Sequence, residues 1–82
     1  MDNARQIEID QNYDFFQRNL VKLLPSHRGE FALLRAKKIV GFFPGPGEAY
    51  RAGLAQFPDE LFSLQEVEDR PAEMGMMSLA LD

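Results

Sequence analysis

The segment FALLRAKKIVGFF, residues 31–43, decides the fold of this 82-residue chain. Apolar side chains dominate residues 31–34 and 39–43, and three of the four residues between them are basic. Two short apolar runs on either side of such a break are typical of a β-hairpin. The pattern predicts strands over 30–35 and 38–43, joined by Ala36-Lys37, although Asn-Gly or Asp-Gly would be the favoured turn. Gly41 inside the second strand predicts a bulge or a close backbone approach.

Two helices and a third strand are predicted outside the hairpin. From residue 10 the apolar side chains recur at spacings of three and four, which is typical of one helical face. That face holds Tyr13, Phe16, Leu20, Leu23 and Leu24. Pro25 is expected to end this helix. A second helix is expected over 47–56, with Gly53 packed closely on the sheet, and a last strand over 61–67.

This order predicts a single small α+β domain, helix-strand-strand-helix-strand, over residues 10–69. We expect a flexible N-terminal arm over 1–9 and a C-terminal hydrophobic tail over 70–82. The sheet is expected to be three-stranded and mainly antiparallel, with both helices on one face. The third strand can pair with the first or, through a crossover, with the second, and we favour the first. The expected core is Phe16, Leu20, Leu33, Val40, Leu54 and Leu64.

Composition and charge limit the classes of function that the chain can have. The chain has no cysteine, which excludes disulfides and thiolate metal sites, and a formal net charge of −4. An acidic protein is repelled by phosphate backbones, so we expect no nucleic-acid partner. No apolar run approaches the roughly 18 residues that a membrane span needs. The first residues lack the apolar segment of a signal peptide, so we expect a cytoplasmic protein without a membrane partner.

The pattern of residues 10–68 resembles a family of short prokaryotic domains of unknown function. The resemblance rests on the aromatic start of the first helix at residues 12–16, on Ile39-Val40-Gly41-Phe42-Phe43, and on the Glu48-Ala49 start of the second helix. It implies the same order of elements and no catalytic residues. The chain departs from the family pattern in two turns, at Ala36-Lys37 and at Pro44-Gly45-Pro46.

No group of residues predicts catalysis, a metal site or a cofactor. Gly45-Pro46-Gly47 precedes a helix, but it lacks the Gly-Lys-Ser/Thr ending of phosphate loops, and Pro46 removes an N–H donor. His27 has no nucleophile or orienting acid in a recognisable motif. The acidic residues at 59–60 and 66–69 lack calcium-loop spacing. We therefore expect a structural turn, an exposed histidine and solvated charges, in a protein that is not an enzyme.

Two clusters are candidates for partner binding. The tail carries five pliable or apolar side chains, namely Met74, Met76, Met77, Leu79 and Leu81. Such side chains fold back on their own sheet, bind a partner or a second copy, or stay disordered; adaptable binding surfaces are often rich in methionine. Basic side chains at the hairpin tip, Arg35, Lys37 and Lys38, form a possible secondary contact, or a solubilising strand edge.

The sequence thus favours a small non-enzymatic protein-interaction module, either an adaptor or a small neutralising or regulatory member of a gene pair. Its expected partner is another protein or a second copy of the chain. The alternative is a small-molecule-binding domain, with the ligand between the first helix, at Tyr13 and Phe16, and the sheet.

Overall fold

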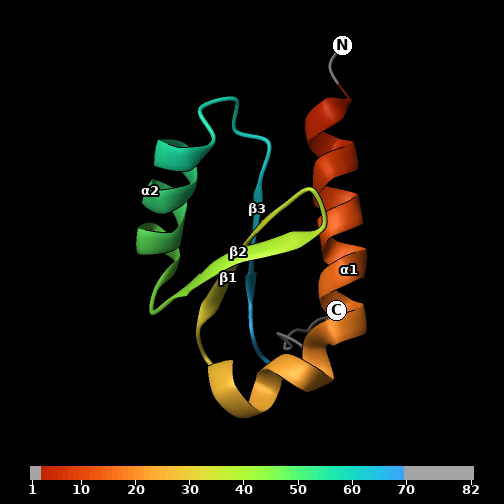
Figure 1. The fold of residues 1–82 in the computed structure, drawn as a ribbon, viewed down its shortest axis with the longest axis vertical. Coiled ribbons are helices and arrows are strands. Elements are labelled where there is room, and N and C mark those ends of the chain that lie inside the picture. The colour runs from red at the N-terminus through yellow and green to blue at the C-terminus, as the bar shows by residue number, and fades with distance from the viewer. Residues whose placement is uncertain (1–2, 70–82) are drawn as a thin grey trace, which may run out of the picture.

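The computed structural model describes residues 3–69 and confirms the order helix-strand-strand-helix-strand (Figure 1). Its five elements are α1 (Ala4–His27), β1 (Phe31–Arg35), β2 (Lys38–Phe43), α2 (Pro46–Gln56) and β3 (Ser63–Glu66). The fold is therefore the expected small α+β domain. The predicted C-terminal tail over 70–82 lies outside the described residues, as do residues 1–2.

The sheet has the order β2-β1-β3, and both pairings are antiparallel. The third strand therefore pairs with the first, as favoured. In the hairpin turn both residues adopt positive φ, 53° at Ala36 and 63° at Lys37, as in the type I′ turns that are common in two-residue hairpin loops. The register shifts between Leu33, opposite Gly41, and Leu34, opposite Ile39. Val40 is the extra residue of this bulge, which confirms the irregularity predicted at Gly41.

The helices cover opposite faces of the sheet, so the expectation that both lie on one face is wrong. Figure 1 shows α1 and α2 on either side of the strands. On one face, Phe16 of α1 packs in a buried cluster with Ala32, Leu34 and Val67. Side chains alternate along a strand, so Leu33, between Ala32 and Leu34, points to the other face. It is fully buried there.

The second face is covered by α2 through its smallest residues. Ala49 and Gly53 are the buried residues of this helix, and Phe62, just before β3, is 6% exposed. A Cβ placed on Gly53 would lie 2.5 Å from Cε1 of Phe62. Gly53 is therefore in close contact, as predicted from the sequence, although the contact is with the Phe62 ring.

Both ends of α1 differ from the predicted ones. The helix begins at Ala4, so residues 4–9 are helical and do not form the expected arm. The apolar periodicity of a helix is not visible in residues 4–9, because Ile7 is exposed and the polar Glu8 turns inward, where it accepts the N–H of Ala36. Pro25 lies inside the helix, which continues to His27. Because Pro25 has no N–H, only the helical hydrogen bond to the Val21 carbonyl is lost. Val21 is 80% exposed, so water can satisfy this carbonyl.

The expected core is confirmed in part. Phe16 and Leu33 are fully buried, whereas Leu20, Leu54 and Leu64 are half-buried. Val40 is 38% exposed, so its assignment to the core was wrong. The bulge takes Val40 out of the alternation that would have turned it inward.

Candidate functional site

The outer edge of β3 is open within the described part of the chain. Val67 donates its N–H to Glu30 and accepts from the N–H of Gly29, both at 2.8 Å, so its backbone points toward β1. Backbone direction alternates along an antiparallel strand. Leu64 and Glu66 therefore direct their N–H and C=O groups away from the sheet, and these groups can receive another strand.

A pocket of about 260 Å³ surrounds this edge. Its lining comes from both helices and from β3, and consists of Arg5, Ile9, Tyr50, Phe62, Ser63, Leu64 and Gln65. Ser63 and Gln65 share the α1 face of the sheet with their neighbours Leu34 and Ala32, whereas Leu64 pairs with Leu33 on the α2 face. We call this pocket and the β3 edge together the β3 groove. It has a polar side along α1 and an aromatic side along α2.

Ser63 carries an unused polar atom in this groove. Its side chain is 8% exposed, and its Oγ has no hydrogen-bond partner among residues 3–69. A buried hydroxyl usually has a partner. The hydroxyl is enclosed beside the groove, so a bound segment could satisfy it only if the Ser63 side chain turned toward the open edge.

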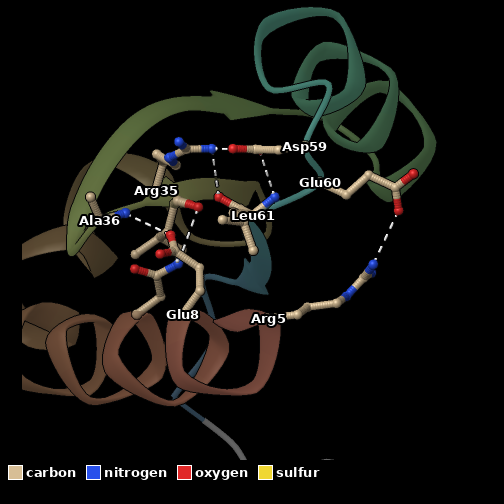
Figure 2. A network of polar contacts seen from close by, with 9 residues as sticks. Arg5, Glu8, Arg35, Ala36, Asp59, Glu60 and Leu61 are labelled. Atoms are coloured by element: carbon tan, nitrogen blue, oxygen red, sulfur yellow. Dashed lines mark hydrogen bonds and ion pairs between the residues drawn. The ribbon is translucent and has the colours of Figure 1, made fainter. Parts of the chain in front are cut away.

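Ion pairs fix the loop that leads into β3, as Figure 2 shows. Arg35 of β1 donates to Asp59 at 2.8 Å and to the carbonyl of Leu61 at 3.1 Å. Arg5 of α1 reaches Glu60 at 3.1 Å. These contacts join the first turn of α1 to the start of β3, so the two walls of the groove are held in one arrangement.

A second set of contacts fixes α1 against the hairpin turn. Glu8 accepts the N–H of Ala36 at 2.6 Å, and Asn12 accepts the N–H of Lys37 at 2.8 Å. The Asn12 amide also donates to Glu8 and to the carbonyl of Leu34. Asn12 is fully buried, and these bonds satisfy its amide. The α1 side of the groove is thus anchored to the central strand.

Paired arginines lower the pKa of two exposed aspartates. A hydrogen bond from Arg35, followed by one from the Leu61 N–H, lowers the pKa of Asp59. The hydrogen bond from Arg28 does the same to the pKa of Asp69. Both carboxylates are therefore engaged in ion pairs and are poor candidates for proton transfer.

The predicted basic cluster is divided. Arg35 turns to Asp59 and lies 4.7 Å over the ring of Phe57, while Lys37 and Lys38 are exposed at the hairpin turn. The three cations therefore do not form one surface.

The remaining residues considered in the sequence have structural contacts. His27, expected to be an exposed bystander, accepts or donates a 2.7 Å bond with Glu30 and stacks on Phe42 at a ring distance of 3.6 Å. Gly45 and Pro46 form the N-terminus of α2. Within residues 3–69, no three His, Cys, Asp or Glu side chains are grouped to hold a metal ion.

Two binding sites were predicted from the sequence, one in the C-terminal tail and one between the first helix and the sheet. The tail residues Met74, Met76, Met77, Leu79 and Leu81 lie outside the described residues. Of the two residues expected to border a ligand, Tyr13 is 51% exposed, and Phe16 is 1% exposed and packs in the buried cluster on the α1 face.

Sequence reasoning missed the β3 groove. The alternation of Phe62, Ser63, Leu64 and Gln65 is typical of a strand with one polar face. Polar residues on one face of this strand, next to the wholly apolar residues 31–34 of β1, were the sequence signal for an exposed edge strand.

Within the described residues, no helix is both long and apolar enough to cross a membrane. Comparison of the chain with protein-family models, curated proteins and solved structures finds no match.

Proposed function

We propose that the protein is a non-enzymatic interaction module that binds an extended segment of a partner protein along β3. The bound segment adds a strand to the sheet, and its side chains enter the β3 groove. The observation that carries this proposal is the open backbone edge at Leu64 and Glu66, bordered by the pocket. Main-chain bonds would supply affinity and the flanking pocket specificity. Such a module can serve as an adaptor or as a regulatory member of a gene pair.

The size of the pocket favours side chains over a drug-sized ligand. Its volume is about 260 Å³. Sites for drug-sized molecules run from about 300 to 1,000 Å³. A few side chains of an extended segment fit this volume, and the strand edge supplies the backbone contacts that a small molecule would leave unused.

The other free edge is less suited to strand addition. The bulge at Val40 interrupts β2, and Lys38 lies exposed at its start. Bulges and edge lysines are features that hinder edge-to-edge pairing. The register of β3 with β1 is uninterrupted over its four residues.

Selection from a displayed library of random peptides tests the proposal. The Glu66→Pro variant removes an outward N–H without breaking a bond of the sheet, and proline is tolerated at such an edge. Glu66→Thr is the matched control, because it removes the carboxylate and keeps the N–H. We expect selected peptides to bind the original chain and the Glu66→Thr variant, and to lose at least tenfold in affinity for Glu66→Pro.

Circular dichroism and thermal melting establish that both variants fold. If folded Glu66→Pro binds the selected peptides as tightly as Glu66→Thr does, strand addition at β3 is wrong. Failure to enrich any peptide also counts against the proposal.

A further inference from the structure

We propose that residues 74–81 of the same chain bind in the β3 groove, as a fourth strand antiparallel to β3. This inference rests on the proposed function, because it assigns a regulator to the same edge. A partner segment would then have to displace the chain's own tail.

The described chain ends in the right place for such a return. Arg28 binds Glu68 and Asp69, each at 2.8 Å, so the chain is held just beyond the end of β3. From Val67 back to Phe62 is five residues, or about 17 Å at ~3.4 Å per residue. Residues 74–81, seven steps, span about 24 Å when extended. The intervening residues 68–73 are enough for a loop of common hairpin or slightly longer length.

The chemistry of the groove selects one register. In an antiparallel pairing that sets Ser78 opposite Ser63, Leu79 lies opposite Phe62 and Met77 opposite Leu64. The two apolar side chains then share the α2 face with Phe62 and Leu64, beside Tyr50, which is 44% exposed and lines the pocket. Cross-strand pairs of this kind are the stabilising unit of a sheet.

The same register satisfies the unused hydroxyl. Ser63 and Ser78 would form a non-hydrogen-bonded pair, in which the Cα atoms lie about 4.5 Å apart and the side chains are closest. The Ser63 Oγ is buried and lacks a partner among residues 3–69. Once the Ser63 side chain rotates toward the edge, the Ser78 hydroxyl can bond with it. Leu64 would exchange its outward N–H and C=O with Met77. A shift of two residues would place Ala80 or Met76 opposite Ser63 and leave the hydroxyl without a partner.

Disulfide trapping tests the register, because the chain has no cysteine of its own. Ser63→Cys with Ser78→Cys should close an intramolecular disulfide under mild oxidation at low micromolar protein. Ser63→Cys with Leu79→Cys is the matched control on the opposite face, and Lys38→Cys with Ser78→Cys the control at the other edge. Both should remain reduced. An equal yield from the controls, no disulfide, or only disulfide-linked dimers would overturn the proposal.

Amide hydrogen exchange gives a measurement on the unmodified chain. The N–H of Leu64 should be protected, as that of Gln65 is within the ladder to β1. In Leu79→Asp the Leu64 amide should exchange at least tenfold faster while the Gln65 amide stays protected. Fast exchange of Leu64 in the unmodified chain would overturn the inference whatever the cysteine variants do.

The tail and the proposed function can fail separately. Peptides from the selection described above should bind Leu79→Asp several-fold more tightly than the unmodified chain, because the competing strand is weakened. Peptides that bind both chains equally would show that the tail does not occupy the groove, and would leave partner binding at β3 intact. A trapped tail with no peptide binding to Leu79→Asp would refute partner binding alone.

Discussion

Adding one methyl group at Gly53 should destabilise the protein, although Gly53 lies in the middle of a helix. A Cβ at this position would lie 2.5, 2.6 and 2.8 Å from Cε1, Cζ and Cδ1 of Phe62. Carbon atoms in favourable contact are about 3.5–4.0 Å apart, so the ring would have to move by about 1 Å. Phe62 is 6% exposed and packs beside Tyr50 and Phe57, which leaves the ring little room.

Two opposing terms set the size of the effect. Replacing a helical glycine with alanine gains about 1 kcal/mol, and overpacking a filled site costs about 1–3 kcal/mol. The free energy of unfolding should therefore fall for Gly53→Ala, by up to about 2 kcal/mol. In a domain of this size, each kcal/mol of lost stability lowers the melting temperature by about 4–8 °C.

Two comparison variants isolate the clash. Gly47→Ala in the same helix meets only the end of Arg51, at 3.6 Å, so it should stabilise by up to about 1 kcal/mol. Phe62→Leu removes the two nearest ring atoms, so Gly53→Ala in that background should be neutral or stabilising. Urea unfolding of all four chains of this double-mutant cycle measures the coupling. A higher melting temperature for Gly53→Ala alone, or zero coupling with Phe62, would refute the reasoning.

Three further predictions concern Asn12, the hairpin turn and Asp59. Asn12→Leu should lower the free energy of unfolding by roughly 1–3 kcal/mol in urea titrations, because the N–H of Lys37 loses its acceptor; an unchanged midpoint contradicts this. Lys37→Gly should raise the melting temperature, since glycine adopts a φ of 63° without the penalty of about 1–2 kcal/mol that other residues incur; Lys38→Gly is the control and should not. Asp59 has a pKa lowered by Arg35 from an ordinary value near 3.8, so its stabilisation is present above that pH and is lost as pH falls through the lowered pKa. Asp59→Asn should therefore reduce stability at pH 7 and flatten its dependence on pH below about 4, and an unaltered acid profile would count against it.

The hairpin and the order of elements could be predicted because they depend on local rules. The alternation of residues 31–43 and the two-residue turn are properties of neighbouring residues. Local patterns leave the pairing of β3 open, because they allow both the favoured pairing with β1 and the crossover pairing with β2. Local patterns of this kind do not report which side of a sheet a helix will cover.

The sequence of β1 carries a signal for the arrangement of the two helices. Ala32, Leu33 and Leu34 are consecutive apolar residues, and all three are fully buried. A strand with one solvent-facing side shows alternation, whereas a strand covered on both faces reads as a continuous apolar run. The run in β1 therefore required cover on both faces, which two helices can provide only from opposite sides.

The inward position of Asn12 could not be found from helical periodicity. The spacing of Tyr13 continues the apolar stripe toward the N-terminus, yet Tyr13 is 51% exposed and Asn12 is fully buried. The reason lies in residues distant in sequence, since Asn12 accepts the N–H of Lys37 and donates to the carbonyl of Leu34. A buried amide is favourable only when such partners exist, and they exist only after the hairpin has docked.

The same reasoning explains why we assign the proposed binding edge to β3. The helices cover the two faces of the sheet, so within residues 3–69 its unpaired backbone groups lie on the two edge strands, β2 and β3. The bulge at Val40 disrupts one of them. The other has regular register, a pocket on its flanks, and Ser63 with a hydroxyl that lacks a partner within residues 3–69. A fourth strand, whether from a partner or from residues 74–81, would satisfy the backbone groups and this hydroxyl together, which is why both proposals meet at β3.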